Sequence, residues 1–156
     1  MSQVTSARLR RRGLRLEYLT IAWNVTEAIV AVAAGVAAGS IALVGFGFDS
    51  SIEVFAATVV VWQFHSDEQG GVDEQRERRA LRLIAITFFV LAAYVTVEAV
   101  RDLIADAEPD TSVTGIVLAC LSLVVMPTLA LAKRRTGREL GSTTLVADSA
   151  ETFLCS

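Results

Sequence analysis

Apolar residues in this sequence come in long runs with few polar interruptions, and short polar breaks separate one run from the next. The first two runs cover residues 19–38 and 41–64. Each reaches the roughly 20 residues that an α-helix needs to cross a hydrocarbon core about 30 Å thick. Only Gly39 and Ser40 lie between them, which predicts a tight hairpin of two spanning helices. Gly35 and Gly39 are expected to let these two helices pack closely.

Two further runs, residues 83–104 and 115–132, predict a third and a fourth span joined by an acidic linker around Pro109. Pro127 lies inside the fourth run and predicts a kink there. The last apolar segment, residues 142–156, would extend only about 22 Å as a helix, too short to cross the bilayer. We therefore expect the sequence to end inside a fifth helix. The expected fold is an all-α, polytopic transmembrane helix bundle with four full spans and an incomplete fifth.

Basic residues cluster outside the apolar runs. If every run crosses the membrane once, all of the 14 lysine and arginine residues except Arg101 lie on one side. The positive-inside rule assigns that side to the cytoplasm. Residues 1–17 then form a basic cytoplasmic segment ahead of a transmembrane domain at 18–156, and Lys133 is predicted to lie in the loop after the fourth span. The expected location is the inner or plasma membrane of a bacterial type of cell.

An arginine-rich start followed by an apolar run is also typical of a cleaved signal peptide. Asn24 and Glu27 interrupt this run, and it is longer than the core of a signal peptide. These two features favour a first spanning helix that stays in the protein.

The composition agrees with a membrane protein and narrows the possible functions. Hydrophobic residues make up 53% of the chain, the mean hydropathy is +0.53 and the net charge is −3. This charge offers no general attraction for nucleic acid. The sequence has no phosphate-binding glycine loop and no nucleophile with a positioned base, so we expect no enzyme activity. Cys120 and Cys155 lie in apolar segments, which argues against a disulfide, and Cys120 is expected to be a packing residue.

Acidic residues occur within the predicted spans and in the unfinished fifth segment, with no basic residue beside them in the sequence. Each ionised acid at mid-bilayer costs about 3 kcal/mol on insertion scales. These side chains must therefore face a bundle interior, hold protons or bind cations. The acids are Glu27, Asp49, Glu53, Glu98, Asp148 and Glu151.

Two pairs of these residues have the spacing of one helical turn. Asp49 and Glu53 stand at positions i and i+4, so their carboxylates share one helix face and repel unless a cation or a proton lies between them. Glu151 and Cys155 repeat this spacing in the fifth segment. Together, Asp49, Glu53, Glu151 and Cys155 predict a four-ligand site for a divalent metal ion such as zinc.

Two further polar residues accompany these pairs. Asn24 lies three residues before Glu27, and Asp148 lies three residues before Glu151. This spacing places each on the same helix face as its acidic neighbour. Asn24 and Asp148 are therefore expected to support the ligands or to line the route to them.

The first two spans, with the residues NVTEAIVAVAAGVAAGSIALVGFGFDSSIEV, resemble the opening of the cation diffusion facilitator family of divalent-metal transporters. The GS hairpin and the D-S-x-x-acid motif that follows are the most specific part. The resemblance implies that Asp49 and Glu53 are the metal ligands of the second of six helices. Glu151 and Cys155 then stand where the family commonly carries His and Asp in its fifth helix, and the resemblance covers about residues 14–156.

The resemblance also implies a homodimer that exchanges a metal ion for protons. The expected function is metal/proton antiport that exports zinc or a similar ion, with manganese, iron, cobalt and cadmium also compatible. The lost histidine favours harder ions, whereas the thiol of Cys155 favours zinc or cadmium. A membrane metal sensor or scaffold, a proton-conducting bundle, or a fragment without activity are the alternatives that the sequence leaves open.

Overall fold

The computed structural model describes residues 3–67, 74–105 and 112–155, and these residues fold into α-helices without strands. The helices are α1 (Gln3–Ala38), α2 (Ile41–Asp67), α3 (Glu74–Ala105), α4 (Val113–Leu140) and α5 (Thr143–Leu154). Four of them, α1 to α4, are long and apolar enough to cross a membrane. The predicted helical membrane bundle is therefore confirmed. The acidic linker predicted around Pro109 lies outside the described residues.

The turn between α1 and α2 forms where the sequence predicts a hairpin. Gly39 adopts a left-handed conformation with φ = 63°, and the backbone N–H of Ser40 donates to the carbonyl oxygen of Gly35 over 2.9 Å. The hydroxyl of Ser40 then accepts a hydrogen bond from the N–H of Leu43, which caps the start of α2. Glycine suits the position of Gly39 because a side chain there would strain the backbone.

Close packing of the hairpin depends on Gly35 and Gly47, which corrects the prediction for Gly39. A Cβ atom on Gly35 would lie 2.7 Å from the backbone nitrogen of Val44, and one on Gly47 would lie 3.0 Å from the carbonyl oxygen of Ala28. A Cβ atom on Gly39 would meet nothing within 4 Å. Gly39 therefore serves the turn, and the other two glycines let the helices approach.

Helix α4 is longer than its apolar run, because it continues past residue 132 to Leu140. It runs through Pro127 as one helix and ends at Gly141, which has a φ of 72°. Ser142 then caps α5 by accepting a hydrogen bond from the N–H of Leu145. Charged residues are compatible with a helix interior, so the helix does not stop where the apolar residues do. Lys133 consequently lies within α4, and the prediction that it belongs to a loop is wrong.

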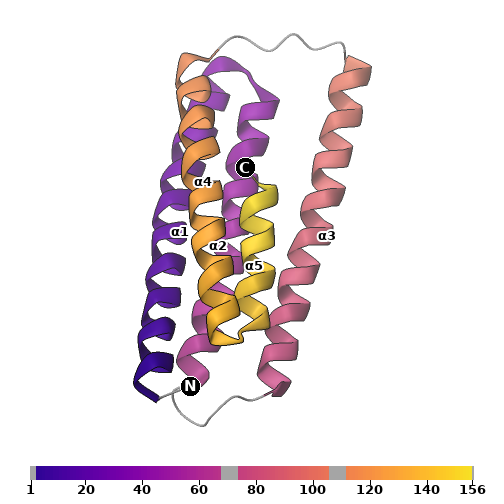
Figure 1. Cartoon of the computed structure of the whole chain (residues 1–156). Helices are drawn as coiled ribbons and strands as arrows, with labels where there is room; N and C mark the ends of the chain where they lie inside the picture. The colour runs from indigo at the N-terminus through magenta and orange to yellow at the C-terminus, as the bar shows by residue number, and fades with distance from the viewer. Residues whose placement is uncertain (1–2, 68–73, 106–111, 156) are drawn as a thin grey trace.

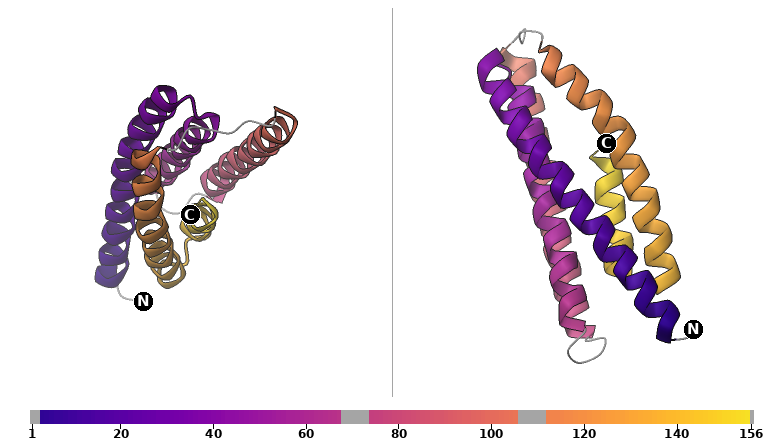
Figure 2. Two further views of the ribbon diagram at one scale, coloured as in Figure 1. Left: turned by 90° about the horizontal axis from the view of Figure 1, so that it is seen from above. Right: turned by 90° about the vertical axis from the view of Figure 1, so that its left-hand side faces the viewer.

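The α1–α2 hairpin lies at one end of the bundle, and the chain start and the α4–α5 turn lie at the other (Figure 1). Helix α1 packs against α2 and α4, whereas α5 packs against α4, α2 and α3. Seen from above, α3 stands on the far side of the bundle from α1 (Figure 2). The short helix α5 thus buries one face, which carries Asp148 and Glu151, against three longer helices, whereas Phe153 and Leu154 are exposed.

Polar side chains face the interior of this bundle, and many large apolar side chains face outward. On α1, Glu17, Thr20, Asn24 and Glu27 are at most 2% exposed. Ile29, on the same helix, is 66% exposed. This arrangement suits a protein whose outer surface contacts lipid. The predicted basic segment at residues 1–17 forms the first part of α1 over the residues that the structure describes.

Candidate cation site

The side chains of Asp49 and Cys155 meet where the C-terminal end of α5, capped by Cys155, lies beside α2. The thiol of Cys155 donates a hydrogen bond to Oδ1 of Asp49 over 3.6 Å, although 106 residues separate the two in the sequence. Both residues are half-buried. The contact joins the two pairs that the sequence predicts as ligands, because each residue is one member of a pair at positions i and i+4.

Glu53 and Glu151 complete these pairs and are almost fully buried. Glu53 is 1% exposed, Glu151 is 0% exposed, and the two carboxylates interact electrostatically. Within the described residues, the only donors near these four carboxylate oxygens are the hydroxyls of Thr152, beside Glu53, and Thr87, beside Glu151, and neither makes a hydrogen bond of good geometry. A buried carboxylate with such weak donors is costly when it is ionised. These oxygens are therefore suited to hold a proton or to accept a cation.

The donor atoms of this region fit a divalent transition metal in kind. Three carboxylates and one thiol combine the oxygen and sulfur ligands that zinc accepts. Among residues 3–67, 74–105 and 112–155, however, no three His, Cys, Asp or Glu side chains gather closely enough to hold a metal ion. The structure thus brings Asp49 to Cys155 and leaves Glu53 and Glu151 as neighbours. The four-ligand set stays a prediction.

Glu27 lies on α1 and forms a hydrogen bond to α2, close to Asp49. Its Oε2 accepts a hydrogen bond from the hydroxyl of Ser50 over 2.9 Å, and its charge interacts with that of Asp49. Asn24 lies one turn earlier and donates to the carbonyl oxygen of Thr20 over 3.0 Å and to the sulfur of Met126 over 3.8 Å. Asn24 therefore contacts α4, and Glu27 is the residue of α1 that approaches the candidate site.

The side chain of Lys133 places a positive charge among the buried acids. Sequence reasoning missed this residue. Its Nζ lies 2.6 Å from Oδ2 of Asp148, 3.0 Å from Oε2 of Glu17 and 3.2 Å from the hydroxyl oxygen of Thr152. The side chains of Lys133, Glu17 and Asp148 are 0% exposed. The prediction that no basic residue accompanies the acids is wrong at this point. Asp148, predicted to support the ligands, binds the ammonium group of Lys133.

The spacing of polar residues on α1 is a signal that would have found Glu17. Glu17, Thr20, Asn24 and Glu27 follow one another at intervals of three and four residues, so they line one face of a helix. This stripe of polar residues continues from the basic segment into the apolar run. If these residues share one buried helix face, Glu17 lies inside the bundle with the other acids.

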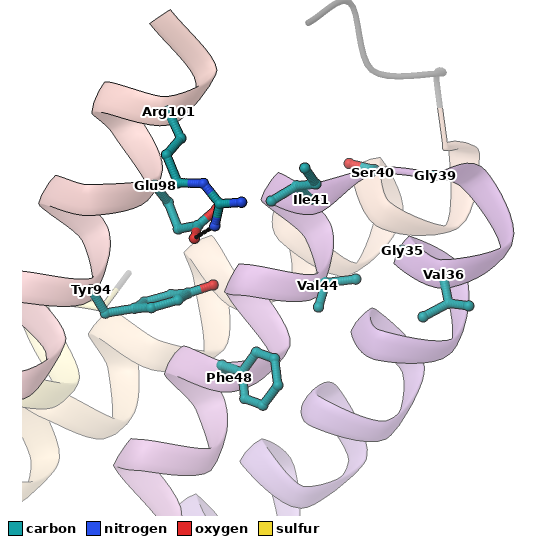
Figure 3. Close-up of a pocket in the computed structure, with 10 residues that line it drawn as sticks. All are labelled: Gly35, Val36, Gly39, Ser40, Ile41, Val44, Phe48, Tyr94, Glu98 and Arg101. Carbon is teal, nitrogen blue, oxygen red and sulfur yellow. Dashed lines mark hydrogen bonds and ion pairs between the residues drawn. The ribbon is translucent and has the colours of Figure 1, made fainter. Parts of the chain in front are cut away.

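Glu98 lies apart from the candidate site, at the hairpin end of the bundle. Its Oε1 pairs with Nη1 of Arg101 over 3.1 Å, so this acid also has a basic partner. Both residues line a cavity of about 430 Å³ between α3 and the hairpin, together with Phe48 and Tyr94 (Figure 3). The rings of Phe48 and Tyr94 meet edge to face with centroids 6.3 Å apart.

Comparisons with known proteins agree with a membrane location. The chain is 25% identical over 139 residues to Transmembrane protein 163 of Xenopus laevis, an alignment that covers 89% of this chain and 49% of that protein. The chain thus spans about half the length of this curated relative. No protein-family model and no solved structure matches the chain. Together with the four candidate spans, this similarity supports an integral membrane protein.

Proposed function

We propose that this chain forms the membrane part of a divalent transition-metal transporter of the cation diffusion facilitator type. Zinc, or an ion of similar ligand preference, is the proposed substrate. The observation that carries the proposal is the 3.6 Å contact between Cys155 on α5 and Asp49 on α2. It joins a thiol to a carboxylate inside an apolar bundle, a combination that favours a transition metal over a hard ion such as magnesium.

Charge balance supports coupling of metal transport to protons. Asp49, Glu53, Glu151 and Cys155 together carry about four negative charges when all are ionised, twice the charge of one divalent ion. Protons therefore neutralise part of this set when the metal is absent. Binding of the metal releases them, because the ligands must be deprotonated. This exchange is metal/proton antiport.

The proposed direction, export from the cytoplasm, is the one that the family resemblance implies. The basic residues near the predicted cytoplasmic ends of the spans assign the N-terminus to that side. A rocking motion of one part of the bundle against another then exposes the site to the opposite side of the membrane. The family resemblance adds a homodimer to this proposal.

A proton-conducting bundle is the second candidate, and one observation favours it. Buried acids and hydroxyls follow one another through the interior, from Glu17, Lys133 and Asp148 past Thr152 toward Glu53. Such a row of titratable and hydroxyl groups is the composition of a proton relay. In this alternative, the thiol of Cys155 has no role in binding metal.

Flux measurements in proteoliposomes distinguish the two candidates. The chain is reconstituted beside its Asp49→Ala and Cys155→Ala variants, and uptake of zinc, cadmium, manganese and iron is followed with an imposed pH gradient. Cys120→Ala is the matched control, because it removes a thiol from an exposed position on α4. We expect zinc flux that is lost in Asp49→Ala, reduced in Cys155→Ala and unchanged in Cys120→Ala.

Each other outcome has a defined meaning. Proton flux that depends on Asp49, without flux of any of the four metals, favours the proton-conducting bundle. Metal flux that ignores the pH gradient removes the antiport part of the proposal. If no ion crosses the membrane in a folded, reconstituted protein, the transporter proposal fails.

A further inference from the structure

Lys133 is the single lysine of a chain whose 13 other basic residues are arginines, the remainder of the 14. It is also completely buried, with its ammonium group between α1 and α5. A lysine ammonium is a compact point charge, whereas the guanidinium of arginine is a flat fork that needs more room. The chain thus has its one compact side-chain cation at the place where a small charge fits best.

The atoms around this ammonium group are arranged as they would be around a bound cation. Three oxygens lie at 2.6, 3.0 and 3.2 Å from Nζ, and they come from two carboxylates and one hydroxyl. The second oxygens, Oε1 of Glu17 and Oδ1 of Asp148, are buried and accept no hydrogen bond from an N–H or hydroxyl group in the described part of the chain, and the two carboxyl groups interact with each other. Their lone pairs are therefore available to a cation that lies between the two groups.

The negative charges in this cluster also outnumber the positive charge. Two carboxylates, those of Glu17 and Asp148, surround one ammonium group, and the carboxylate of Glu53 adds a further electrostatic attraction for Lys133. Removal of the ammonium group would leave two neighbouring buried acids with no cation. Such a pair must be neutralised by a proton or by a replacement cation, and a divalent cation can neutralise both carboxylates at once.

We propose that Lys133 is a tethered cation that fills an oxygen-lined cation position formed by Glu17, Asp148 and Thr152. A free divalent cation of calcium size occupies this position when the ammonium group is removed. Calcium binds oxygen ligands at about 2.3–2.6 Å and tolerates irregular geometry. Small inward movements of the three oxygens would therefore suffice. The position has no sulfur or nitrogen ligand, so it favours hard ions.

This arrangement has a consequence for the neighbouring candidate site. Lys133 interacts electrostatically with Glu53 and Glu151 as well as with its direct partners. Because its charge is covalently held, Glu17 and Asp148 cannot compete with the candidate site for a mobile ion. Lys133 is thus a positioning residue that restricts mobile cations to the site around Asp49 and Cys155. The inference concerns binding, and it stands whether or not the chain transports an ion.

Binding of radiolabelled calcium by equilibrium dialysis tests the inference. The full chain in detergent micelles is compared with its Lys133→Met variant, in which an apolar side chain of similar length replaces the lysine. Arg134→Met is the matched control, because it removes the same charge from an exposed position next to Lys133. We expect one additional calcium ion per chain in Lys133→Met, and the wild-type number in Arg134→Met.

A double variant identifies where the extra ion binds. Lys133→Met combined with Asp148→Asn is expected to lose the additional calcium, since one of the two carboxylates is gone. Lys133→Arg retains a positive charge and is expected to bind no additional ion. An unchanged calcium number in folded Lys133→Met, or additional calcium that persists in the double variant, overturns the proposal.

Thermal stability gives a readout that remains useful if Lys133→Met folds poorly. A cation that binds the folded state raises the melting temperature with its concentration. The melting temperature of Lys133→Met is expected to fall in a chelator and to recover by several degrees in millimolar calcium. Wild type and Arg134→Met should show no such recovery. A Lys133→Met protein whose melting ignores calcium contradicts the proposal.

Discussion

Replacing Glu17 by Gln and Asp148 by Asn, singly and together, measures how the buried ammonium group of Lys133 is neutralised. Each carboxylate lies within 3.0 Å of Nζ, and all three side chains are 0% exposed. Either single change leaves one carboxylate beside one ammonium group, which is a balanced pair. The double change leaves a buried cation with neither of its direct carboxylate partners, and this state has the highest free energy.

The magnitudes follow from this difference. Each single substitution exchanges a charged contact for a neutral one, and we expect a cost of about 1 kcal/mol in the free energy of unfolding. The double substitution removes both carboxylates from the buried ammonium group, and breaking a buried ion pair in this way lowers the free energy of unfolding by about 3–5 kcal/mol. The double variant should therefore lose about 1–3 kcal/mol more than the sum of the two singles.

The assay is equilibrium unfolding in mixed micelles with increasing SDS, followed by the loss of helical circular dichroism. Glu139→Gln serves as a control, since Glu139 pairs with Arg135 on the exposed face of α4 and should change stability little. If the two single costs add up to the double cost, Glu17 and Asp148 do not share one ammonium group in the folded protein, and the reasoning about Lys133 fails.

Three further predictions concern the packing of the hairpin and can be measured in the same assay. Gly47→Ala should cost about 1–3 kcal/mol, because its Cβ would lie 3.0 Å from a backbone oxygen of α1; an unchanged stability would show that the helices separate freely. Gly39→Ala should cost about 1 kcal/mol through its φ of 63° alone, whereas a gain in stability would contradict that strain. Ser50→Ala should cost about 1–3 kcal/mol by removing the 2.9 Å bond to Glu27, and Ser51→Ala, which removes a 3.0 Å bond to the carbonyl oxygen of Gly47, should cost less. Equal costs for the two serines would mean that the bond to Glu27 adds nothing.

The spans of the bundle could be predicted from the sequence because their length is set by the thickness of the bilayer. The α1–α2 turn could be predicted because two small residues separate two apolar runs. The ends of α3 and α4 could not, since apolar runs mark the part of a helix that lies in lipid. Helix α3 begins at Glu74, ahead of its predicted run, and α4 continues to Leu140 through charged residues that are good helix formers.

The candidate site was accessible to sequence reasoning in part. The spacing of Asp49 and Glu53 is a local property of one helix, and so is that of Glu151 and Cys155. Which helices bring the pairs together depends on tertiary packing, and the structure places α5 against α2. Lys133 was missed because it follows an apolar run and begins a basic stretch with Arg134, Arg135 and Arg138, a pattern that predicts a topology signal. Its burial depends on α5 folding back along α4.

The partners of Lys133 lie far apart along the chain, and this separation constrains how the protein is made. Along the chain, Glu17 on α1 is made before Lys133 on α4, and Asp148 on α5 follows both. An unpaired acid in lipid costs about 3 kcal/mol, and Glu17 gains its basic partner only when α4 packs against α1. Asp148 joins after Lys133, when α5 folds back. The buried cluster is therefore complete only in a bundle in which α1, α4 and α5 have all assembled.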